Sequence, residues 1–107
     1  MAPGTNKELI RRTVGEYLRV LREGKVPVHH LYLFGSWAKD RADDGSDIDV
    51  AVFLDQDDLD GFDEDVRLMK LRRSVDLRIE PRAFARTDEV DPDPFVQEIL
   101  ATGELFS

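Results

Sequence analysis

The eight residues from Asp47 to Leu54 constrain the fold more than any other segment of the chain. Side chains alternate between the two faces of a β-strand, so this segment predicts one face of Ile48, Val50, Val52 and Leu54, and an opposite face of Asp47, Asp49, Ala51 and Phe53. The two aspartates must therefore point the same way. Carboxylates held alone in so apolar a strand would be costly, and a bound cation would remove that cost.

The preceding residues predict a helix and a second strand. Thr5 and Glu8 form a capping-box pattern, and apolar residues then recur at helical spacing until Gly24. Residues 28–34 are rich in β-branched and aromatic side chains and end at Gly35, which is typical of a buried strand. A polar turn segment of residues 36–46 therefore lies between two strands.

The second half of the chain predicts two more helices and a third strand. A helix is expected over residues 66–71, followed by a strand over residues 75–79 that carries Asp76 on one side and ends at Pro81. Asp93-Pro94 is typical of a helix start, and Gly103 of a helix end. The length of 107 residues suits a single domain over residues 1–107 with one modest core.

Composition excludes several kinds of site. The net charge of −8 disfavours nonspecific attraction to nucleic-acid backbone, so no direct nucleic-acid binding is expected. Cysteine is absent, so a metal would have to bind oxygen ligands. Neither a signal peptide nor an apolar run of roughly 20 residues is evident, which predicts a cytoplasmic, soluble protein without membrane association.

Acidic pairs are frequent in this sequence, so the Asp-x-Asp spacing proves little by itself. The same spacing recurs in Asp55/Asp57, Asp58/Asp60, Asp63/Asp65 and Asp91/Asp93, which we interpret as solvated surface. The pair Asp47/Asp49 differs because its strand is otherwise apolar. Residues two apart on a strand are separated by roughly 6.6 Å, close enough for both carboxylates to reach shared hard divalent ions.

Two other features have an ordinary and a functional interpretation. A glycine at Gly35 lets backbone N–H groups approach a phosphate, and the Ser36 hydroxyl adds a donor, although Gly-Ser also begins many plain loops. Asp76 is either a functional acid, an exposed strand residue, or the partner of adjacent arginines. His29 and His30 are interpreted as ordinary strand-edge residues rather than metal ligands, and Trp37 either stacks on a base or packs over the loop.

Together these features resemble a known signature. Residues 31–39 and 46–52 resemble the minimal nucleotidyltransferases of the DNA polymerase β-like superfamily: Gly-Ser, ten residues, Asp-x-Asp, and a third acid on a later strand, here met by Asp76. The resemblance covers nearly the whole chain. It implies an α/β (α+β) fold in which helices flank a small mixed sheet of three or more strands, in the order α-β-turn-β-α-β-α.

The resemblance also implies the site. Asp47, Asp49 and Asp76 would be the catalytic, metal-binding carboxylates for two Mg²⁺ ions, or for Mn²⁺. The nucleotide, ATP or another NTP, would be held by Gly35, Ser36, Lys39 and Ser46. Relatives commonly have glycine after the basic residue, and Asp40 departs from this pattern by placing a negative charge near the expected triphosphate.

Minimal members of this superfamily are often antitoxins paired with a helical HEPN-type toxin. The resemblance thus implies transfer of AMP from ATP to a hydroxyl acceptor, a tyrosine of such a partner. The alternative is a catalytically weak or inactive binding module that neutralises its partner by masking it. The sequence leaves the nucleotide, the acceptor and the oligomeric state open, a homo-oligomer included.

Overall fold

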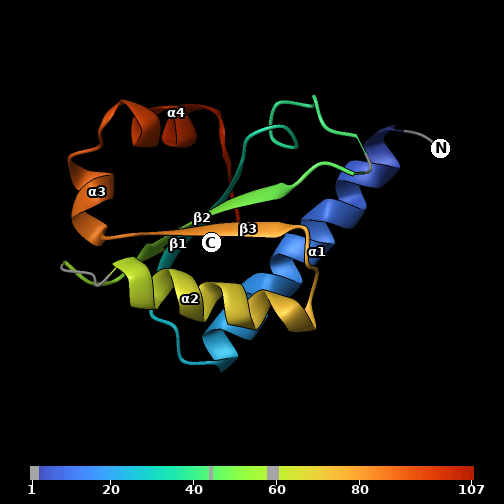
Figure 1. Ribbon diagram of the computed structural model, residues 1–107. Helices are drawn as coiled ribbons and strands as arrows, with labels where there is room; N and C mark the ends of the chain where they lie inside the picture. The colour runs from blue at the N-terminus through green and yellow to red at the C-terminus, as the bar shows by residue number, and fades with distance from the viewer. Residues whose placement is uncertain (1–2, 44, 58–60) are drawn as a thin grey trace.

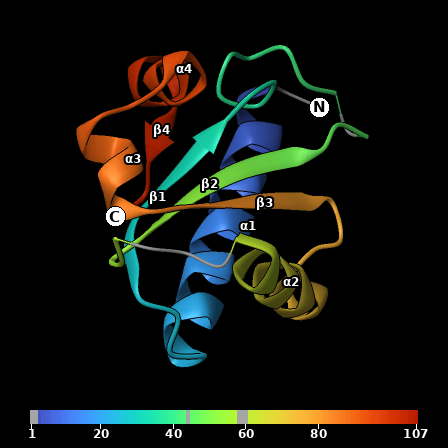
Figure 2. The same cartoon turned by 60° about the vertical axis from the view of Figure 1, so that its left-hand side comes forward.

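The chain forms a mixed sheet covered by helices on both faces (Figures 1 and 2). The computed structural model describes residues 3–43, 45–57 and 61–107. One face carries α1 (Pro3–Glu23) and α2 (Gly61–Leu71), and the other carries α3 (Arg86–Val90) and α4 (Pro94–Thr102). A single 3-10 turn, Arg72–Ser74, follows α2.

The sheet has four strands in the spatial order β3-β2-β1-β4. The strands are β1 (Val28–Phe34), β2 (Ile48–Leu54), β3 (Ile79–Phe84) and β4 (Glu104–Leu105). β1 runs antiparallel to both β2 and β4, whereas β2 and β3 are parallel. The expected α/β fold with a small mixed sheet is thereby confirmed.

The two faces of β2 build two separate apolar clusters, as its alternation predicts. Ile48, Val50, Val52 and Leu54 pack beneath α1 and α2 in the larger cluster. Ala51 and Phe53 pack against Val96 and Ile99 of α4 in the smaller one. Because both of its faces are covered, β2 is the central strand of the fold, and Asp49 lies near its first residue.

One hydrogen bond links the two helices on the larger cluster. The buried Tyr17 hydroxyl of α1 donates to the Leu68 carbonyl of α2 over 2.7 Å. Burial raises the pKa of Tyr17, so the hydroxyl remains protonated and available as a donor.

Several predicted boundaries are wrong, among them that of α2, which begins at Gly61 and not near residue 66, and three short elements were not expected: the 3-10 turn, α3 and β4. The third strand covers Ile79–Phe84 instead of residues 75–79, because Pro81 is accommodated inside this edge strand, where its missing N–H costs no pairing. α1 begins at Pro3, before Thr5, and proline is favoured at the first helical position. β2 begins at Ile48, one residue after Asp47. The short elements α3 and β4 have too few residues to show periodicity.

The final helix agrees with its sequence signals. The Asp93 carboxylate caps α4 by accepting a hydrogen bond from the Val96 N–H over 2.8 Å, and Gly103 forms its C-cap. Within the described parts of the chain, none of the helices has the length and apolar character required to cross a bilayer.

Candidate active site

The paired aspartates lie where the chain enters β2. Asp47 is exposed just before the strand, and Asp49 is partly buried within it, opposite Phe34 at the end of β1. The described members of the other acidic pairs are exposed, at positions 55, 57, 63, 65, 91 and 93, whereas Asp58 and Asp60 lie outside the described residues. Burial therefore separates Asp49 from the surface acids, whereas Asp47, which the sequence placed with it, is exposed as they are.

A third carboxylate lies beside Asp49, and it belongs to Glu80. β2 and β3 pair in parallel with Asp49 directly opposite Glu80. Burial raises the pKa of Asp49, and the charges of Asp47 and Glu80 raise it further, while Arg82 partly offsets them. Asp49 thus feels the charges of two other carboxylates at one end of the sheet.

Asp76 takes a different place. It precedes β3 and forms an ion pair with Arg78, with 2.8 Å between Arg78 Nη2 and Asp76 Oδ2. The same carboxylate accepts the Arg78 backbone N–H, and these contacts lower the pKa of Asp76. This is the arginine-partner interpretation considered from the sequence. That Asp76 is a metal ligand stays a prediction, and Glu80 is the other candidate for this role.

Glu80 was missed because sequence alone gave the wrong strand boundary. It lies four residues after Asp76, but a strand predicted over residues 75–79 contains Asp76 and not Glu80 as the candidate third acid. The signal that could have found it is the tolerance of edge strands for proline, which lets the strand run on through Pro81. The register with β2 then puts Glu80 next to Asp49.

The turn after β1 brings a tight backbone segment to the same carboxylates. Gly35 has φ = 73°, a left-handed conformation that favours glycine, and its backbone lies directly against the Asp49 carboxylate. The Lys39 N–H donates to the Gly35 carbonyl over 3.1 Å, which closes the turn, and Ser36 is exposed on it. Gly35, Ser36 and Asp49 are thereby brought together.

Trp37 fixes this turn to the protein body. It is 6% exposed within the larger apolar cluster, and its indole N–H donates to the Ser46 carbonyl over 3.5 Å. Of the two interpretations of Trp37, packing is the confirmed one. The Ser46 hydroxyl is engaged within the same loop, where it is paired with the backbone N–H and carboxylate of Asp43.

Lys39 lines a pocket between the turn and α4. Its ammonium group lies 2.8 Å from Glu98 Oε1, and this contact lowers the pKa of Glu98. The pocket has a volume of about 210 Å³, and it is lined by Phe34, Gly35, Lys39, Phe95, Glu98, Ile99 and Thr102. Its apolar wall meets the polar turn, a combination suited to a ligand that is flat and apolar at one end and anionic at the other.

Asp40 is turned away from this pocket. Its φ of 57° explains why glycine suits this position, and its carboxylate lies 2.8 Å from Lys7 of α1. The side chain is 75% exposed, and the lysine lowers its pKa. The negative charge introduced at this position is therefore directed toward solvent and toward a cation.

The Asp47, Asp49 and Glu80 carboxylates are of the chemical type that binds a hard divalent cation, although their oxygens are not gathered within 4.8 Å of one another. Asp47, Asp49 and Glu80 offer only carboxylate oxygens, the ligands that Mg²⁺ prefers, and their repulsion would be relieved by a bound ion. Two such ions about 3.5 to 4 Å apart are typical of phosphoryl-transfer sites. This end of the sheet therefore places carboxylate oxygens next to the backbone of the Gly35 turn.

A mixed sheet that places clustered carboxylates beside a glycine turn defines the nucleotidyltransferase class. Residues 18–107 match the family described as "Polymerase beta, Nucleotidyltransferase". The chain therefore belongs to the polymerase β-like nucleotidyltransferases, and the resemblance inferred from its sequence is confirmed. None of the curated proteins matches the chain significantly.

Three solved structures share the fold at low sequence identity. A putative nucleotidyltransferase from Sulfolobus solfataricus is 18% identical with a TM-score of 0.67, and the match covers 99% of this chain and 87% of that one. A mutant of the toxin–antitoxin MntA-HpeT is 24% identical with a TM-score of 0.59, covering 86% and 69%. A toxin–antitoxin with AMP-PNP is 18% identical with a TM-score of 0.53, covering 89% and 70%.

Proposed function

We propose that this chain is a Mg²⁺-dependent nucleotidyltransferase that transfers AMP from ATP to a hydroxyl group of a partner protein. The observation that carries the proposal is the convergence on Asp49: the Gly35 turn packs against its carboxylate, and Glu80 lies opposite it in the sheet. In this proposal, the backbone that would bind phosphate and the oxygens that would bind metal lie at one end of the sheet, in a chain of the nucleotidyltransferase family.

Each carboxylate has a distinct part in this proposal. Asp47, just before β2, and Asp49, within β2, hold the metal, and Glu80 completes the set from β3, with Asp76 as the alternative third acid. Bound Mg²⁺ supplies neutralising charge for the phosphates and lowers the pKa of the acceptor hydroxyl. The acceptor oxygen attacks the α-phosphorus, the bond to the bridging β-phosphate oxygen breaks, and pyrophosphate leaves. The hydroxyl proton passes to one of the carboxylates.

The turn and its pocket would hold the nucleotide. The Ser36 hydroxyl and the backbone at Gly35 face the β- and γ-phosphates in this proposal, and Lys39 neutralises charge that develops on pyrophosphate. Ser46 supports the turn in this proposal, because its carbonyl accepts the hydrogen bond from the Trp37 indole N–H. The apolar wall formed by Phe34 and Phe95 suits one face of an adenine ring.

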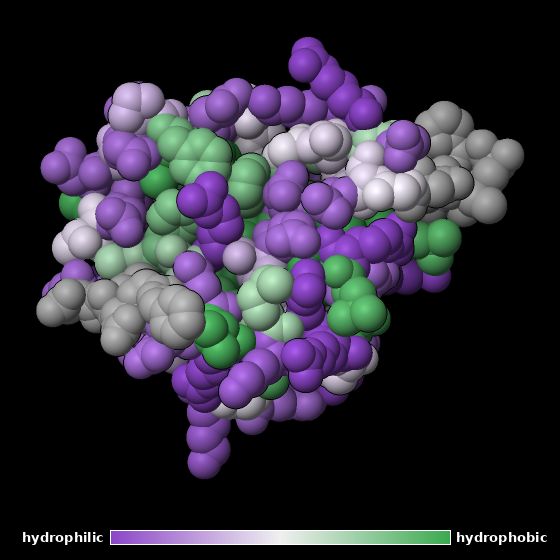
Figure 3. Space-filling view, in the orientation of Figure 1, coloured by the Kyte–Doolittle hydropathy of each residue, from purple (hydrophilic) through white to green (hydrophobic). Residues whose placement is uncertain are grey.

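The acceptor in this proposal is a tyrosine of a helical, HEPN-type toxin, so that the chain acts as an antitoxin. Two structures of the same fold are described as toxin–antitoxin, one of them with AMP-PNP, and these support a partner and an adenine nucleotide. Apolar side chains gather around α3 and α4 (Figure 3), where Val90 is 80% and Phe95 is 40% exposed. A partner docked there would lie next to the pocket.

Calorimetric titration of ATP with Mg²⁺ tests the catalytic half of the proposal. Wild-type protein should bind ATP only when Mg²⁺ is present, and the Asp47→Asn/Asp49→Asn variant should not bind it. AMP transfer is then measured by mass spectrometry on a candidate helical partner purified together with the chain. A mass increase of one AMP on a tyrosine-containing peptide, absent with the double variant, is the expected result.

The masking alternative predicts a different outcome from the same experiments. A module that only covers its partner would form the complex and neutralise the partner equally well with the double variant. Neutralisation that persists without ATP binding would therefore overturn the enzymatic proposal. Metal-dependent ATP binding together with loss of neutralisation in the double variant would overturn the masking alternative.

A further inference from the structure

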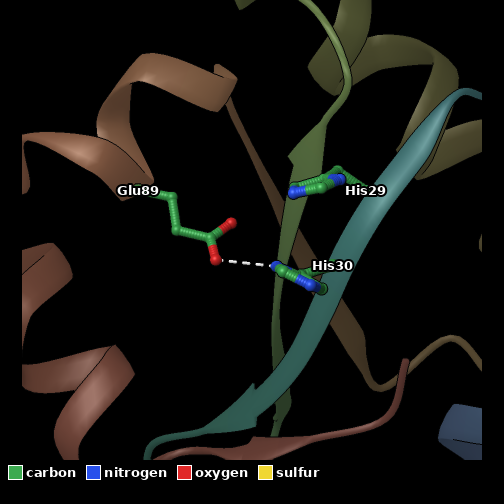
Figure 4. Close-up of side chains that lie close together, drawn as sticks. All are labelled: His29, His30 and Glu89. Carbon is green, nitrogen blue, oxygen red and sulfur yellow. Dashed lines mark hydrogen bonds and ion pairs between the residues drawn. The ribbon is translucent and has the colours of Figure 1, made fainter.

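A second group of metal-ligating side chains lies away from the carboxylate site. His29 and His30 of β1 and Glu89 of α3 each offer one ligand atom, and these atoms lie within 4.8 Å of one another. Figure 4 shows both imidazoles on the side of β1 that faces Glu89. His30 pairs with Phe53, four residues beyond Asp49 on β2, so roughly 13 Å of strand separate the two groups.

An irregularity in β1 makes this cluster possible. Neighbouring residues of a regular strand point to opposite faces, so His29 and His30 should diverge. The register between β1 and β2 shifts at this point: Val28 pairs with Leu54 and His30 with Phe53, which leaves His29 as one extra residue. Such a bulge re-aims a side chain, and the two ring centroids are only 4.2 Å apart.

Packing on either side of the bulge confirms the change of face. Val28 packs against the larger apolar cluster, beneath α1. His30 instead lies on the opposite face, with its ring 6.3 Å from that of Tyr32. In a regular strand Val28 and His30 would share a face, so the bulge is what brings His29 beside His30 under α3.

Glu89 is held over the two histidines with one oxygen unused. Its Oε2 lies 2.7 Å from His30 Nδ1, whereas its Oε1 is buried and has no hydrogen-bond partner among the described residues. A buried oxygen without a partner is costly, and a cation would satisfy it.

The helix that carries Glu89 is fixed independently of the histidines. Arg86 of α3 forms ion pairs with Asp55 and Asp57, at 3.0 Å and 2.9 Å, just after β2 ends. The Arg86 backbone N–H also donates to the Gln56 carbonyl over 2.8 Å. Glu89 is therefore presented to β1 by a tethered helix, which is the preorganisation that a metal site requires.

We infer that His29, His30 and Glu89 form a binding site for a divalent transition metal of the zinc type. Imidazole nitrogen and carboxylate oxygen are zinc ligands at about 2.0 to 2.2 Å, so bound ligand atoms lie roughly 3.3 Å apart. The three ligand atoms of this group already lie within 4.8 Å of one another. His29 is exposed, which leaves a fourth position open to water. The ion takes the place of a proton between His30 and Glu89, and it ties α3 to β1.

Zinc titration in a background without the first site tests this inference. Calorimetry on the Asp47→Asn/Asp49→Asn variant should show one Zn²⁺ ion bound per chain, because the histidine group is untouched. Adding His29→Ala or Glu89→Gln should weaken binding by at least about tenfold in each case. His29 is exposed, so its replacement leaves the fold intact, which a melting curve without metal verifies.

Asp91→Asn is the matched control, because it removes one exposed negative charge two residues from Glu89 and should leave zinc affinity unchanged. Bound Co²⁺ should in addition give the intense visible absorption of a four-coordinate site, lost with His29→Ala. The inference is overturned if the double variant binds no zinc, or if either His29→Ala or Glu89→Gln binds it as tightly as the double variant. These readouts do not involve ATP, so they are independent of the proposed enzymatic function.

Discussion

A Cβ atom placed on Gly35 would lie 2.3 Å from Oδ2 of Asp49, well inside van der Waals contact. The turn after β1 and the strand β2 therefore meet without room for a single methyl group. Because Gly35 also has φ = 73°, two independent features demand glycine at this point. The geometry of the turn and the position of the carboxylate are consequently linked.

Gly35→Ala should lower the stability of the fold and weaken ATP binding. A left-handed alanine costs about 1–2 kcal/mol, and the methyl group must displace the Asp49 carboxylate. We expect the unfolding free energy to fall by that amount or more, and Mg²⁺-dependent ATP binding to weaken by at least about tenfold. Chemical denaturation and calorimetry measure the two effects.

Gly45→Ala provides the control for this substitution. Gly45 belongs to the same loop, but a Cβ there would meet Asp43 Oδ1 at an ordinary 3.6 Å. This variant should bind ATP as wild type does. Equal loss of binding in both alanine variants would show that loop rigidity, and not the contact between Gly35 and Asp49, determines nucleotide affinity.

Glu80→Gln and Asp76→Asn distinguish the two candidates for the third carboxylate. If Glu80 completes the metal site beside Asp49, Glu80→Gln should lower the rate of AMP transfer by about 10²-fold, which corresponds to about 2.7 kcal/mol. Asp76→Asn should weaken only the contact with Arg78, with a stability loss below about 1 kcal/mol and little effect on transfer. Steady-state kinetics at saturating Mg²⁺ compares them, and the reverse order of effects would assign the role to Asp76.

Asp49→Asn should separate stability from function. The folded protein raises the pKa of Asp49, chiefly by burial and then by the charges of Asp47 and Glu80, so the folded state binds this proton more tightly than the unfolded state does. Ionised Asp49 therefore costs stability above its folded pKa, and the cost disappears as the pH falls through that pKa. The variant should melt at a higher temperature than wild type at pH 7 without metal, while losing metal-dependent ATP binding.

The pH dependence supplies the check on this explanation. The stability difference between Asp49→Asn and wild type should be full at pH 7 and should shrink as the pH falls through the raised pKa toward the ordinary 3.8. Asp91→Asn, which removes an exposed charge, should change stability little at any pH. A difference for Asp49→Asn that does not vary with pH would rule out relief of charge repulsion as its cause.

Sequence could predict those parts of the fold that rest on periodicity. The alternation of β2, the apolar spacing of α1 and the cap of α4 at Asp93 are local properties, and each appears in the structure as expected. The placement of Gly35 beside Asp49 also followed, because the Gly-Ser to Asp-x-Asp spacing is a family signature. Local patterns and a specific motif therefore determined most of the architecture.

Features that depend on register could not be predicted in the same way. Glu80 lies beside Asp49 only because β3 runs through Pro81 and pairs in parallel with β2. His29 and His30 share a side of β1 only because of a one-residue bulge, and Glu89 is 59 residues from His30 along the chain. The pairing of distant segments determines where these residues lie, and this pairing cannot be predicted from any single stretch of sequence.

The contact between Lys39 and Glu98 leads to the last prediction. The Glu98 carboxylate of α4 lies 2.8 Å from the Lys39 ammonium group, and both residues line the pocket beside Gly35. A nucleotide phosphate must compete with this carboxylate for Lys39, and the carboxylate also repels the phosphate. Glu98→Gln should therefore tighten ATP binding by about two- to fivefold, mostly at low salt, where exposed charges are least screened.

Two further variants serve as controls. Lys39→Met should weaken ATP binding, and Asp91→Asn, an equal change in net charge elsewhere, should have no effect. ATP affinities measured by calorimetry at two salt concentrations test all three, and unchanged affinity in Glu98→Gln would remove Lys39 from the phosphate site.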